Sequence, residues 1–291
     1  MSSARPVLAI GVIAPHGDIA VPDACDEATR GLAEATQQAM DEVGRLVAAA
    51  EPDAVVIATP HNLHVGGHIA VITASEVEGR LDESPNPIPL SARTHRDLAE
   101  AVVTELRTND VPVVGVSFGG NDPSEAVAPL DWGVIVPLWH IARSAPEVPV
   151  VVVAPARDLD AAAHVRAGAA VVRAAARAAT SIAFVASADQ GHGHSAEGPY
   201  GFHPESAPFD RRVVDLVRRH ALDELLDIGA DAVHAALADS WWQMLMLHGA
   251  LTEDGGGFGA RVLSYEAPTY YGMLTALFER LPSTSIASSP G

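Results

Sequence analysis

The chain has 291 residues, of which 48% are hydrophobic, and its formal net charge at pH 7 is −19. Such an acidic chain repels phosphate backbones and anionic membrane surfaces, so we expect neither nucleic acid nor a membrane as a partner. Arginine supplies all 18 positive charges, because the sequence contains no lysine. The composition favours a protein with a large buried core that acts on a small molecule.

Cysteine content and hydropathy indicate the cellular compartment in which the protein is expected. Cys25 is the single cysteine, which excludes an intrachain disulfide and a thiolate zinc cluster. The N-terminus lacks the pattern of a signal peptide. No apolar run approaches the roughly 20 residues that are needed to cross a bilayer. We therefore expect a cytoplasmic protein.

Strand-like apolar runs alternate with helical patterns along most of the chain. We expect strands at 7–13, 54–58, 68–73, 112–117, 149–153, 181–187 and 261–265. We expect helices at 27–50, 95–108, 161–179, 210–219, 222–228, 231–239, 241–251 and 270–280. This alternation predicts an α/β fold with a mainly parallel or mixed central sheet and helices on both faces. Residues 1–281 are expected to form a single domain, and residues 282–291 a flexible tail.

Two long connections interrupt this pattern, at residues 74–93 and 188–209. Long loops in compact domains are usually functional or disordered. The second connection follows a predicted strand and carries several histidines, so we expect it to be functional.

Two histidines each follow a strand-like run and a proline. His16 ends the segment Ala14-Pro-His, and His61 ends Thr59-Pro-His. In an open α/β sheet, ligands bind beyond the carboxyl ends of the strands. We therefore expect both imidazoles at one crevice, where they would bind a metal ion. The alternative is that each is an ordinary hydrogen-bonded histidine at the end of a strand.

Glu266 directly follows the predicted strand 261–265 and lies close to a proline. A carboxylate beside two histidines completes a ligand set that is typical of non-haem iron(II), with positions left open for substrate and oxygen. We therefore predict a metal site of His16, His61 and Glu266, with Fe(2+) as the expected ion. Zinc and manganese accept the same ligands. A solvated carboxylate or an ion-pair partner is the alternative for Glu266.

The predicted strand 181–187 leads into Asp189-Gln-Gly-His-Gly-His194. An imidazole at this edge that does not bind the metal suits acid–base catalysis, because its ordinary pKa of about 6.5 lies near neutrality. We predict His192 as the catalytic acid–base residue, with His194 as a second candidate. A histidine-rich surface loop is the alternative.

A few further aromatic and imidazole side chains are expected in the core or in the wall of the substrate pocket. Trp241, Trp242 and His140 lie in apolar stretches, where such side chains are usually buried. Tyr270 or Tyr271 is expected to line the pocket.

Five short motifs occur in the order seen in class III extradiol ring-cleavage dioxygenases, the LigB-type superfamily. The motifs are Ala14–Gly17, Thr59–His61, Leu130–Leu138, Ser187–His192 and Ser264–Pro268. The chain resembles this family from residue 7 to about residue 280. The resemblance implies an α/β fold, a mononuclear iron(II) held by His16, His61 and Glu266, and acid–base catalysis by His192.

One motif departs from the family's pattern. Many members have Leu-Asp-His-Gly where this chain has Leu130-Asp-Trp-Gly133. Trp132 can donate a hydrogen bond, but it cannot shuttle a proton at neutral pH. Either His140 or His194 compensates for the missing histidine, or the substrate differs from an ordinary catechol, for instance an aminophenol.

The leading hypothesis is an extradiol dioxygenase that cleaves a catechol-like or aminophenol-like ring with O2. We expect a homo-oligomer or a pairing with a small second subunit, as in some relatives. A zinc hydrolase that uses the same ligands, with His192 as the base, is the first alternative. The second alternative is a non-catalytic metal-binding relative, which Trp132 favours.

Overall fold

The computed structural model describes residues 5–82, 84–119 and 122–281. Its main feature is an eight-stranded sheet in the order β10-β11-β1-β9-β2-β8-β3-β6. These strands are β1 (Leu8–Ala14), β2 (Ala54–Ala58), β3 (Ile69–Ile72), β6 (Val113–Val116), β8 (Val150–Ala154), β9 (Ile182–Ser187), β10 (Phe258–Glu266) and β11 (Met273–Arg280).

The centre of the sheet is parallel and its flanks are mixed. Strands β1, β9, β2 and β8 run parallel to one another, whereas β11 is antiparallel to β1, and β3 to β8. Strands β2, β8 and β9 are buried along their whole length, because helices cover both faces of the sheet. The predicted fold class is therefore confirmed. The predicted tail, 282–291, lies outside the described residues.

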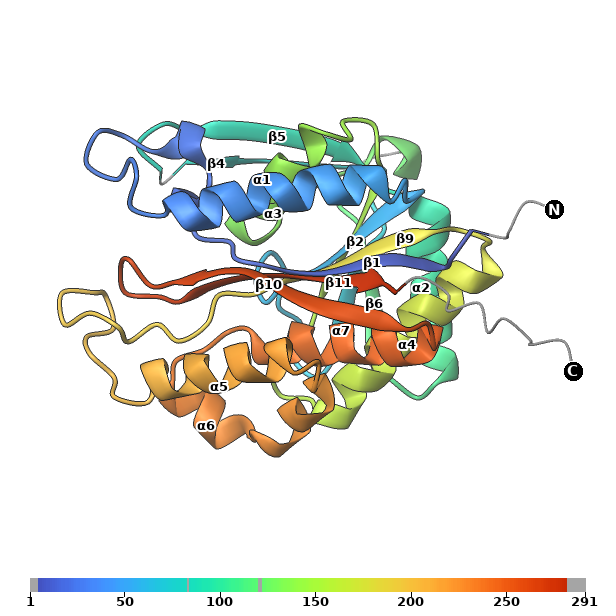
Figure 1. The fold of residues 1–291 in the computed structure, drawn as a ribbon. Coiled ribbons are helices and arrows are strands. Elements are labelled where there is room, and N and C mark those ends of the chain that lie inside the picture. The colour runs from blue at the N-terminus through green and yellow to red at the C-terminus, as the bar shows by residue number, and fades with distance from the viewer. Residues whose placement is uncertain (1–4, 83, 120–121, 282–291) are drawn as a thin grey trace, which may run out of the picture.

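The helices form two layers on opposite faces of the sheet (Figure 1). One layer holds α1 (Glu34–Ala49) and α3 (Trp132–Ala142), with a small sheet of β4 (Glu76–Leu81), β5 (Ile88–Arg93) and β7 (Val127–Leu130). The other layer holds α2 (Arg96–Thr108), α4 (Ala161–Arg177), α5 (Ser206–Arg218), α6 (Ala230–Ala235) and α7 (Trp241–Asp254). Short 3-10 helices span Asp18–Ala20, Pro22–Ala24, Pro123–Glu125 and Leu222–Asp227. Within the described ranges, no helix is both long and apolar enough to cross a bilayer.

Several element predictions are wrong, and tertiary pairing explains most of them. Residues 270–280 do not form a helix, because strand β11 pairs on both sides, with β1 and with β10. Residues 74–93 are not a loop but hold the β4–β5 hairpin. Helix α3 was not predicted, because it is apolar on nearly every side and so lacks an amphipathic period. The helix predicted at 27–50 begins only at Glu34.

Helices α4 and α7 pack in direct backbone contact, and two glycines make this possible. A Cβ atom at Gly168 would lie 1.7 Å from the carbonyl oxygen of Met246. A Cβ atom at Gly249 would lie 2.0 Å from the carbonyl oxygen of Val165. Because the obstructing atoms are backbone, they cannot rotate aside. This contact fixes the position of α7, whose first turn follows residues of the site described below.

We expect Gly168→Ala to lower the free energy of unfolding by about 2 to 3 kcal/mol, since the added methyl group forces the two helices apart. Urea unfolding followed by circular dichroism measures this change. Gly257→Ala is the matched control, because a Cβ atom there meets nothing within 4 Å, and we expect it to change stability by less than about 0.5 kcal/mol. Equal losses in the two variants would contradict the proposed role of close packing.

Candidate active site

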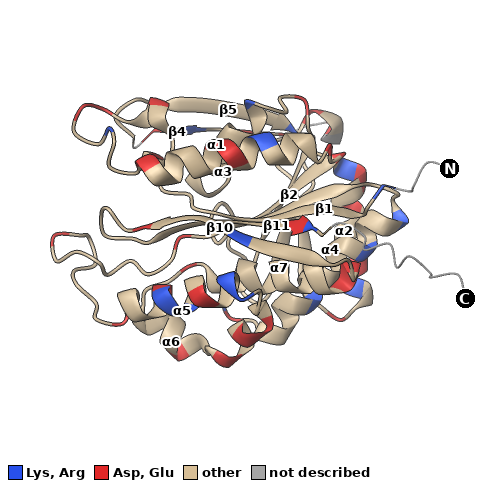
Figure 2. Ribbon diagram, in the orientation of Figure 1, with Lys and Arg blue, Asp and Glu red and all other residues tan. Residues whose placement is uncertain are grey.

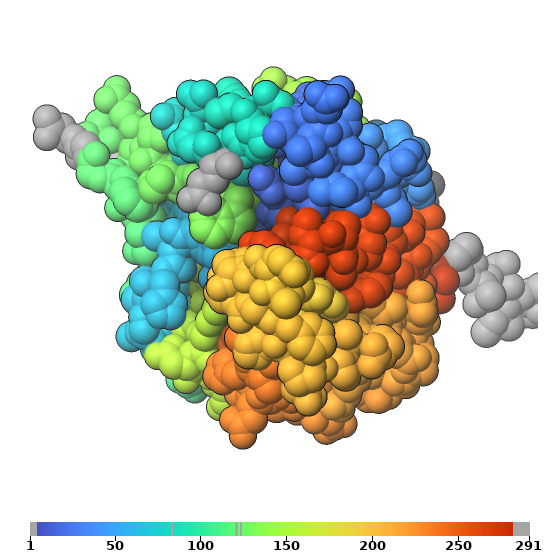
Figure 3. Space-filling model, turned by 90° about the vertical axis from the view of Figure 1, so that its left-hand side faces the viewer, coloured from blue at the N-terminus to red at the C-terminus, as the bar shows by residue number. Residues whose placement is uncertain are grey.

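A cavity of about 1080 Å³ lies beyond the carboxyl ends of the central parallel strands. Three of its lining residues follow these strands: His16 after β1, His61 after β2 and Asp189 after β9. Figure 3 views the molecule from this end, where the segments near residues 20–33 (blue), 267–272 (red) and 195–205 (yellow) lie side by side. The structure thus brings His16 and His61 to one crevice.

The imidazoles of His16 and His61 meet the carboxylate of Asp239. Its Oδ2 lies 3.1 Å from Nε2 of His61 and 3.5 Å from Nε2 of His16. The two imidazole rings are perpendicular, with centroids 4.9 Å apart. Neighbouring ligands of an octahedral ion with bonds of about 2.1 Å lie about 3 Å apart. These three residues therefore form a possible metal site.

Hydrogen bonds around His16 fix its tautomer and leave its Nε2 available to bind a cation. Ser187 donates its hydroxyl hydrogen to the carbonyl oxygen of Gly133 at 2.5 Å, so its oxygen accepts from Nδ1 of His16 at 3.0 Å. Nδ1 is therefore protonated, and Nε2 is the nitrogen that can take up a proton or a metal ion. Within the described ranges, Nε2 of His16 and Oδ1 of Asp239 are buried without a hydrogen-bond partner. A divalent ion would satisfy both atoms, so the residues fit a metal.

The electrostatics of the site favour a positive charge at the same place. Burial alone would lower the pKa of His16, but the carboxylates of Asp189, Asp239 and Asp131 raise it to about 9. The pKa of Asp239 is lowered well below its usual range, because His16 and His61 outweigh the effect of burial. In the absence of a metal the site holds a proton, and a metal ion would have to displace it.

Asp189 lies beside the three residues of the possible metal site and contacts His16. Its Oδ1 accepts a hydrogen bond from the backbone N–H of His16 at 3.0 Å, and its Oδ2 lies 3.5 Å from Nε2 of His16. Burial raises the pKa of Asp189. Asp189 thus fixes the turn that follows β1 and adds to the negative potential around the possible metal site.

The third ligand predicted from the sequence, Glu266, is not at this site, and the prediction is corrected to Asp239. Oε1 of Glu266 accepts a hydrogen bond from the backbone N–H of Thr36 at 2.7 Å, near the start of α1. Strand β10 ends at the expected edge of the sheet, but it lies two strands from β1 and four from β2. With about 4.8 Å between strands, Glu266 is roughly 10 to 20 Å away from the two histidines. Asp239 was not predicted as a ligand because it falls at the end of the predicted helix 231–239 and does not end a strand. In the structure α6 ends at Ala235, and Asp239 precedes α7.

His192 lies beside the possible metal site without being part of it. Its Nδ1 donates to the carbonyl oxygen of Leu237 at 2.8 Å, and a carbonyl can only accept. Nε2 is therefore left as a proton acceptor, 4.0 Å from Oδ2 of Asp239. The ring of Tyr271 stacks on this imidazole, with centroids 5.8 Å apart and planes at 28°. This arrangement suits proton transfer at Nε2 to or from a ligand in the cavity.

The second catalytic candidate, His194, does not line the cavity, and this prediction is corrected as well. Its Nε2 lies 2.8 Å from Oδ2 of the buried Asp210. The hydroxyl of Tyr265 donates to the same oxygen at 2.7 Å, and the backbone N–H of Gly191 donates to Oδ1 at 2.7 Å. His194 therefore anchors the loop that carries His192.

Trp132 forms part of the cavity wall at the start of α3. Its side chain is 42% exposed, and its ring lies 4.8 Å from that of His61. His140 cannot take over proton transfer at the position of Trp132, because the imidazole of His140 is buried in the core. It is hydrogen-bonded to Asp41 and to the carbonyl oxygen of Ala20. Since His194 is also outside the cavity, neither histidine replaces the one that many relatives carry at this position.

Other wall residues were predicted only in part. Tyr270 and Tyr271 both line the cavity, as expected for at least one of them. Trp241 and Trp242 are buried, as predicted, but Trp242 also borders the cavity. His234 lines the same wall, although its helical pattern in the sequence gave no sign of it.

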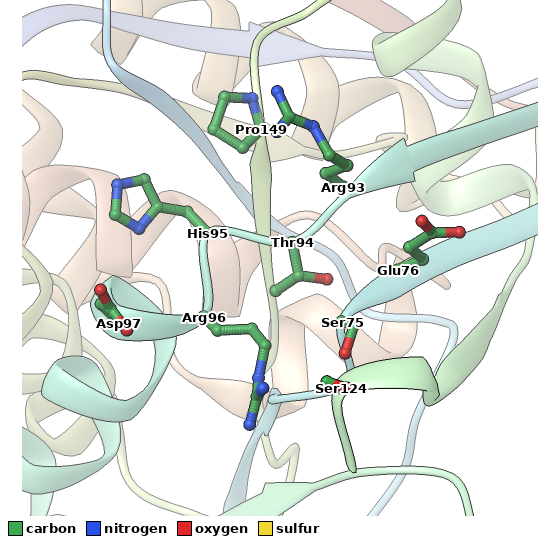
Figure 4. Close-up of a pocket in the computed structure, with 9 residues that line it drawn as sticks. All are labelled: Ser75, Glu76, Arg93, Thr94, His95, Arg96, Asp97, Ser124 and Pro149. Carbon is green, nitrogen blue, oxygen red and sulfur yellow. The ribbon is translucent and has the colours of Figure 1, made fainter. Parts of the chain in front are cut away.

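A second hollow of about 470 Å³ lies where β5 leads into α2 (Figure 4). The side chains of Arg93 and Arg96 point in opposite directions there, as Figure 4 shows. Glu76 and Asp97 add negative charge to the same wall. Because its charged groups do not converge on one point, we assign no chemistry to this hollow.

Comparisons with known proteins agree with this architecture. The solved structure of the uncharacterized protein JW3007 from Escherichia coli K12 shares the fold, with a TM-score of 0.56 and 18% identity over 92% of this chain and 98% of that one. Protein CA_C1420 of Clostridium acetobutylicum is 24% identical over 254 residues. That match covers 87% of this chain but 53% of the relative, so the chain spans about half of its length. The sequence profile of the catalytic LigB subunit of aromatic ring-opening dioxygenase matches residues 11–275, and the chain therefore belongs to this family.

Proposed function

We propose that this protein is a non-haem iron(II) dioxygenase that opens a catechol-like or aminophenol-like ring and incorporates both atoms of O2. The observation that carries the proposal is the group of His16, His61 and Asp239, which lies in a large cavity beside His192. Two histidines and one carboxylate are the ligand set typical of non-haem iron(II). Membership of the LigB family supports both the ring-opening reaction and its dependence on a metal.

The residues of the cavity suit the proton transfers that such a reaction needs. A bound metal ion would orient two neighbouring ring substituents and stabilise their negative charge. Nε2 of His192 accepts the proton of a ring hydroxyl and later returns a proton to the product. Burial raises the pKa of Tyr271 well above its ordinary value, so its hydroxyl stays protonated at neutral pH. Tyr271 and Tyr270 thus form a wall that does not compete with His192 for the proton.

Oxygen consumption tests the proposal directly. The protein is loaded with iron(II) under anaerobic conditions and then mixed with catechol, 2-aminophenol or 3,4-dihydroxybenzoate in oxygenated buffer. We expect one O2 to be consumed per ring opened with at least one of the three, together with a new absorbance from the ring-opened product. The proposal fails if none of them consumes oxygen, or if the protein retains one zinc ion and hydrolyses esters without using oxygen.

A further inference from the structure

Two glycines flank the proposed base in Gly191-His-Gly193, and the packing of helix α5 explains both. A Cβ atom at Gly191 would lie 2.7 Å from Cβ of Ser206, and one at Gly193 would lie 2.8 Å from the hydroxyl oxygen of Ser206. Both distances are shorter than a real Cβ atom tolerates. The loop that carries His192 therefore lies in direct contact with Ser206, the first residue of α5.

Two polar side chains of α5 face this loop. Most charged residues of α5 (Figure 2) are exposed to solvent, whereas Ser206 and Asp210, which lie one turn apart, are fully buried. Asp210 accepts a hydrogen bond from the backbone N–H of Gly191 at 2.7 Å. The hydroxyl oxygen of Ser206 accepts one from the backbone N–H of Gly193 at 3.0 Å. Each glycine beside His192 is thus hydrogen-bonded to one of these two side chains.

Ser206 also contacts the segment that orients the imidazole of His192. Its hydroxyl group donates a hydrogen bond to the carbonyl oxygen of Ala236 at 2.8 Å, and the backbone N–H of His192 donates to the same oxygen at 3.2 Å. The next residue, Leu237, provides the carbonyl oxygen that accepts from Nδ1 of His192 at 2.8 Å. One hydroxyl group therefore connects the loop of the proposed base with the turn that fixes its tautomer.

The backbone at Leu237 has a conformation that is unfavourable for its side chain. Leu237 follows the end of α6 with φ at 53°, in the left-handed region that glycine adopts readily but a leucine adopts at a cost in free energy. Two backbone hydrogen bonds within residues 233–238 close this turn, and the bond from Ser206 to Ala236 adds a contact from outside it. We expect the carbonyl group of Leu237 to move when that contact is lost.

We propose that Ser206 is a positioning residue for proton transfer, because its hydroxyl group holds the turn that orients the imidazole of His192. This inference rests on the proposed function, in which Nε2 of His192 exchanges a proton with the substrate. Ser206 is fully buried and is not part of the described cavity wall, so it acts through His192. Its removal should lower the rate of proton transfer and leave the binding of substrate and metal unchanged.

Ser206→Ala removes both hydrogen bonds of the hydroxyl group. In the iron(II)-loaded protein we expect kcat to fall about 10- to 100-fold, since a catalytic group displaced by about 1 Å loses this much. KM for the ring substrate should stay within about 2-fold, and the iron content should not change. Ser181→Ala is the matched control, because Ser181 is also buried and donates to a backbone carbonyl, that of Pro6. It precedes β9 at the opposite edge of the sheet, so we expect wild-type kcat.

Nitrogen-15 NMR of the histidine side chains tests the positioning without any reaction. The full chain is labelled at its imidazole nitrogens and measured at pH 8 with zinc(II), a diamagnetic substitute for iron(II). The signals of His192 are those missing from His192→Gln. We expect wild-type His192 to carry its proton on Nδ1 alone and Ser206→Ala to populate both neutral tautomers. Ser206→Cys has a similar shape but weaker hydrogen bonds, so it should give an intermediate result, and it carries the test if Ser206→Ala does not fold.

The inference is overturned if Ser206→Ala retains the single tautomer of His192 or the wild-type kcat. It is also overturned if this variant loses iron or raises KM as much as it lowers kcat, or if Ser181→Ala causes the same changes. The NMR measurement needs neither oxygen nor turnover. A wild-type protein that consumes no O2, but whose single tautomer is lost in Ser206→Ala, would refute the proposed reaction and leave the effect of Ser206 on His192 standing.

Discussion

Asp239→Asn is expected to lower the affinity for iron(II) about 100-fold or more and to abolish oxygen consumption. The substitution keeps the size of the side chain but removes the one negative charge among the three proposed ligands. The effect should be large because Asp239 lies within 3.5 Å of Nε2 of both histidines and its Oδ1 is buried without a hydrogen-bond partner among the described residues. Equilibrium dialysis against iron(II), followed by metal analysis, measures the loss.

Glu266→Gln is the matched control for this prediction. It replaces a carboxylate whose role in the structure is to accept a hydrogen bond from the backbone N–H of Thr36. We expect it to reduce the free energy of unfolding by about 1 kcal/mol and to leave the metal content unchanged. Retention of iron by Asp239→Asn, with its loss in Glu266→Gln, would refute the ligand set proposed from the structure and restore the one expected from the sequence.

The sequence was sufficient to place two of the three proposed ligands, because topology alone brings them together. His16 and His61 follow strands that run parallel with one strand between them, and both strands are recognisable as short β-branched apolar runs. The end of the predicted strand 261–265 likewise puts Glu266 at the correct edge of the sheet, but the sequence pattern does not predict the order of the strands. Strand order decides the distance, and it depends on long-range pairing that no local pattern encodes.

The role of Asp239 could not be predicted from the sequence, because it too depends on long-range contacts. Asp239 stands before α7, in Ala238-Asp-Ser-Trp241, and the sequence pattern makes it the last residue of the predicted helix 231–239, where a carboxylate does not indicate a metal ligand. It reaches the two histidines because the start of α7 is held beside the end of β9. Ser240 donates a hydrogen bond to the side-chain oxygen of Gln190, and Gln243 donates to the carbonyl oxygens of Ser187 and Asp239. Close packing of α7 on α4 at Gly168 and Gly249 supports this position, so tertiary contacts set the role of Asp239.

The errors in the fold have the same origin. Residues 273–280 contain good helix formers such as Leu274, Ala276 and Leu277, yet they form a strand between β1 and β10. The free energy gained by pairing on both sides and by burial outweighs a propensity difference of a few tenths of a kcal/mol per residue. The central strands were predicted correctly because burial on both faces leaves a continuous apolar run in the sequence.

His192→Gln is expected to retain iron and to reduce kcat about 100- to 10,000-fold, which is the range that general acid–base catalysis contributes. The reason is the orientation of the imidazole: Nδ1 is committed to the carbonyl oxygen of Leu237, so Nε2 is the acceptor that faces the possible metal site. Glutamine can still donate to that carbonyl oxygen but cannot exchange a proton. Stopped-flow oxygen consumption at saturating substrate measures kcat, and metal analysis of the same sample measures iron.

His194→Gln is the control for His192→Gln. It disturbs the loop that carries His192 without removing the proposed catalytic imidazole. His194 is bonded to Asp210 and lies outside the cavity, so this variant should lose stability, by about 1 to 3 kcal/mol, and keep kcat within about 10-fold. Wild-type turnover in His192→Gln would refute its role in proton transfer. Loss of iron from His192→Gln would instead indicate that His192 is a metal ligand. The assignment of three ligands with a separate base would then be wrong.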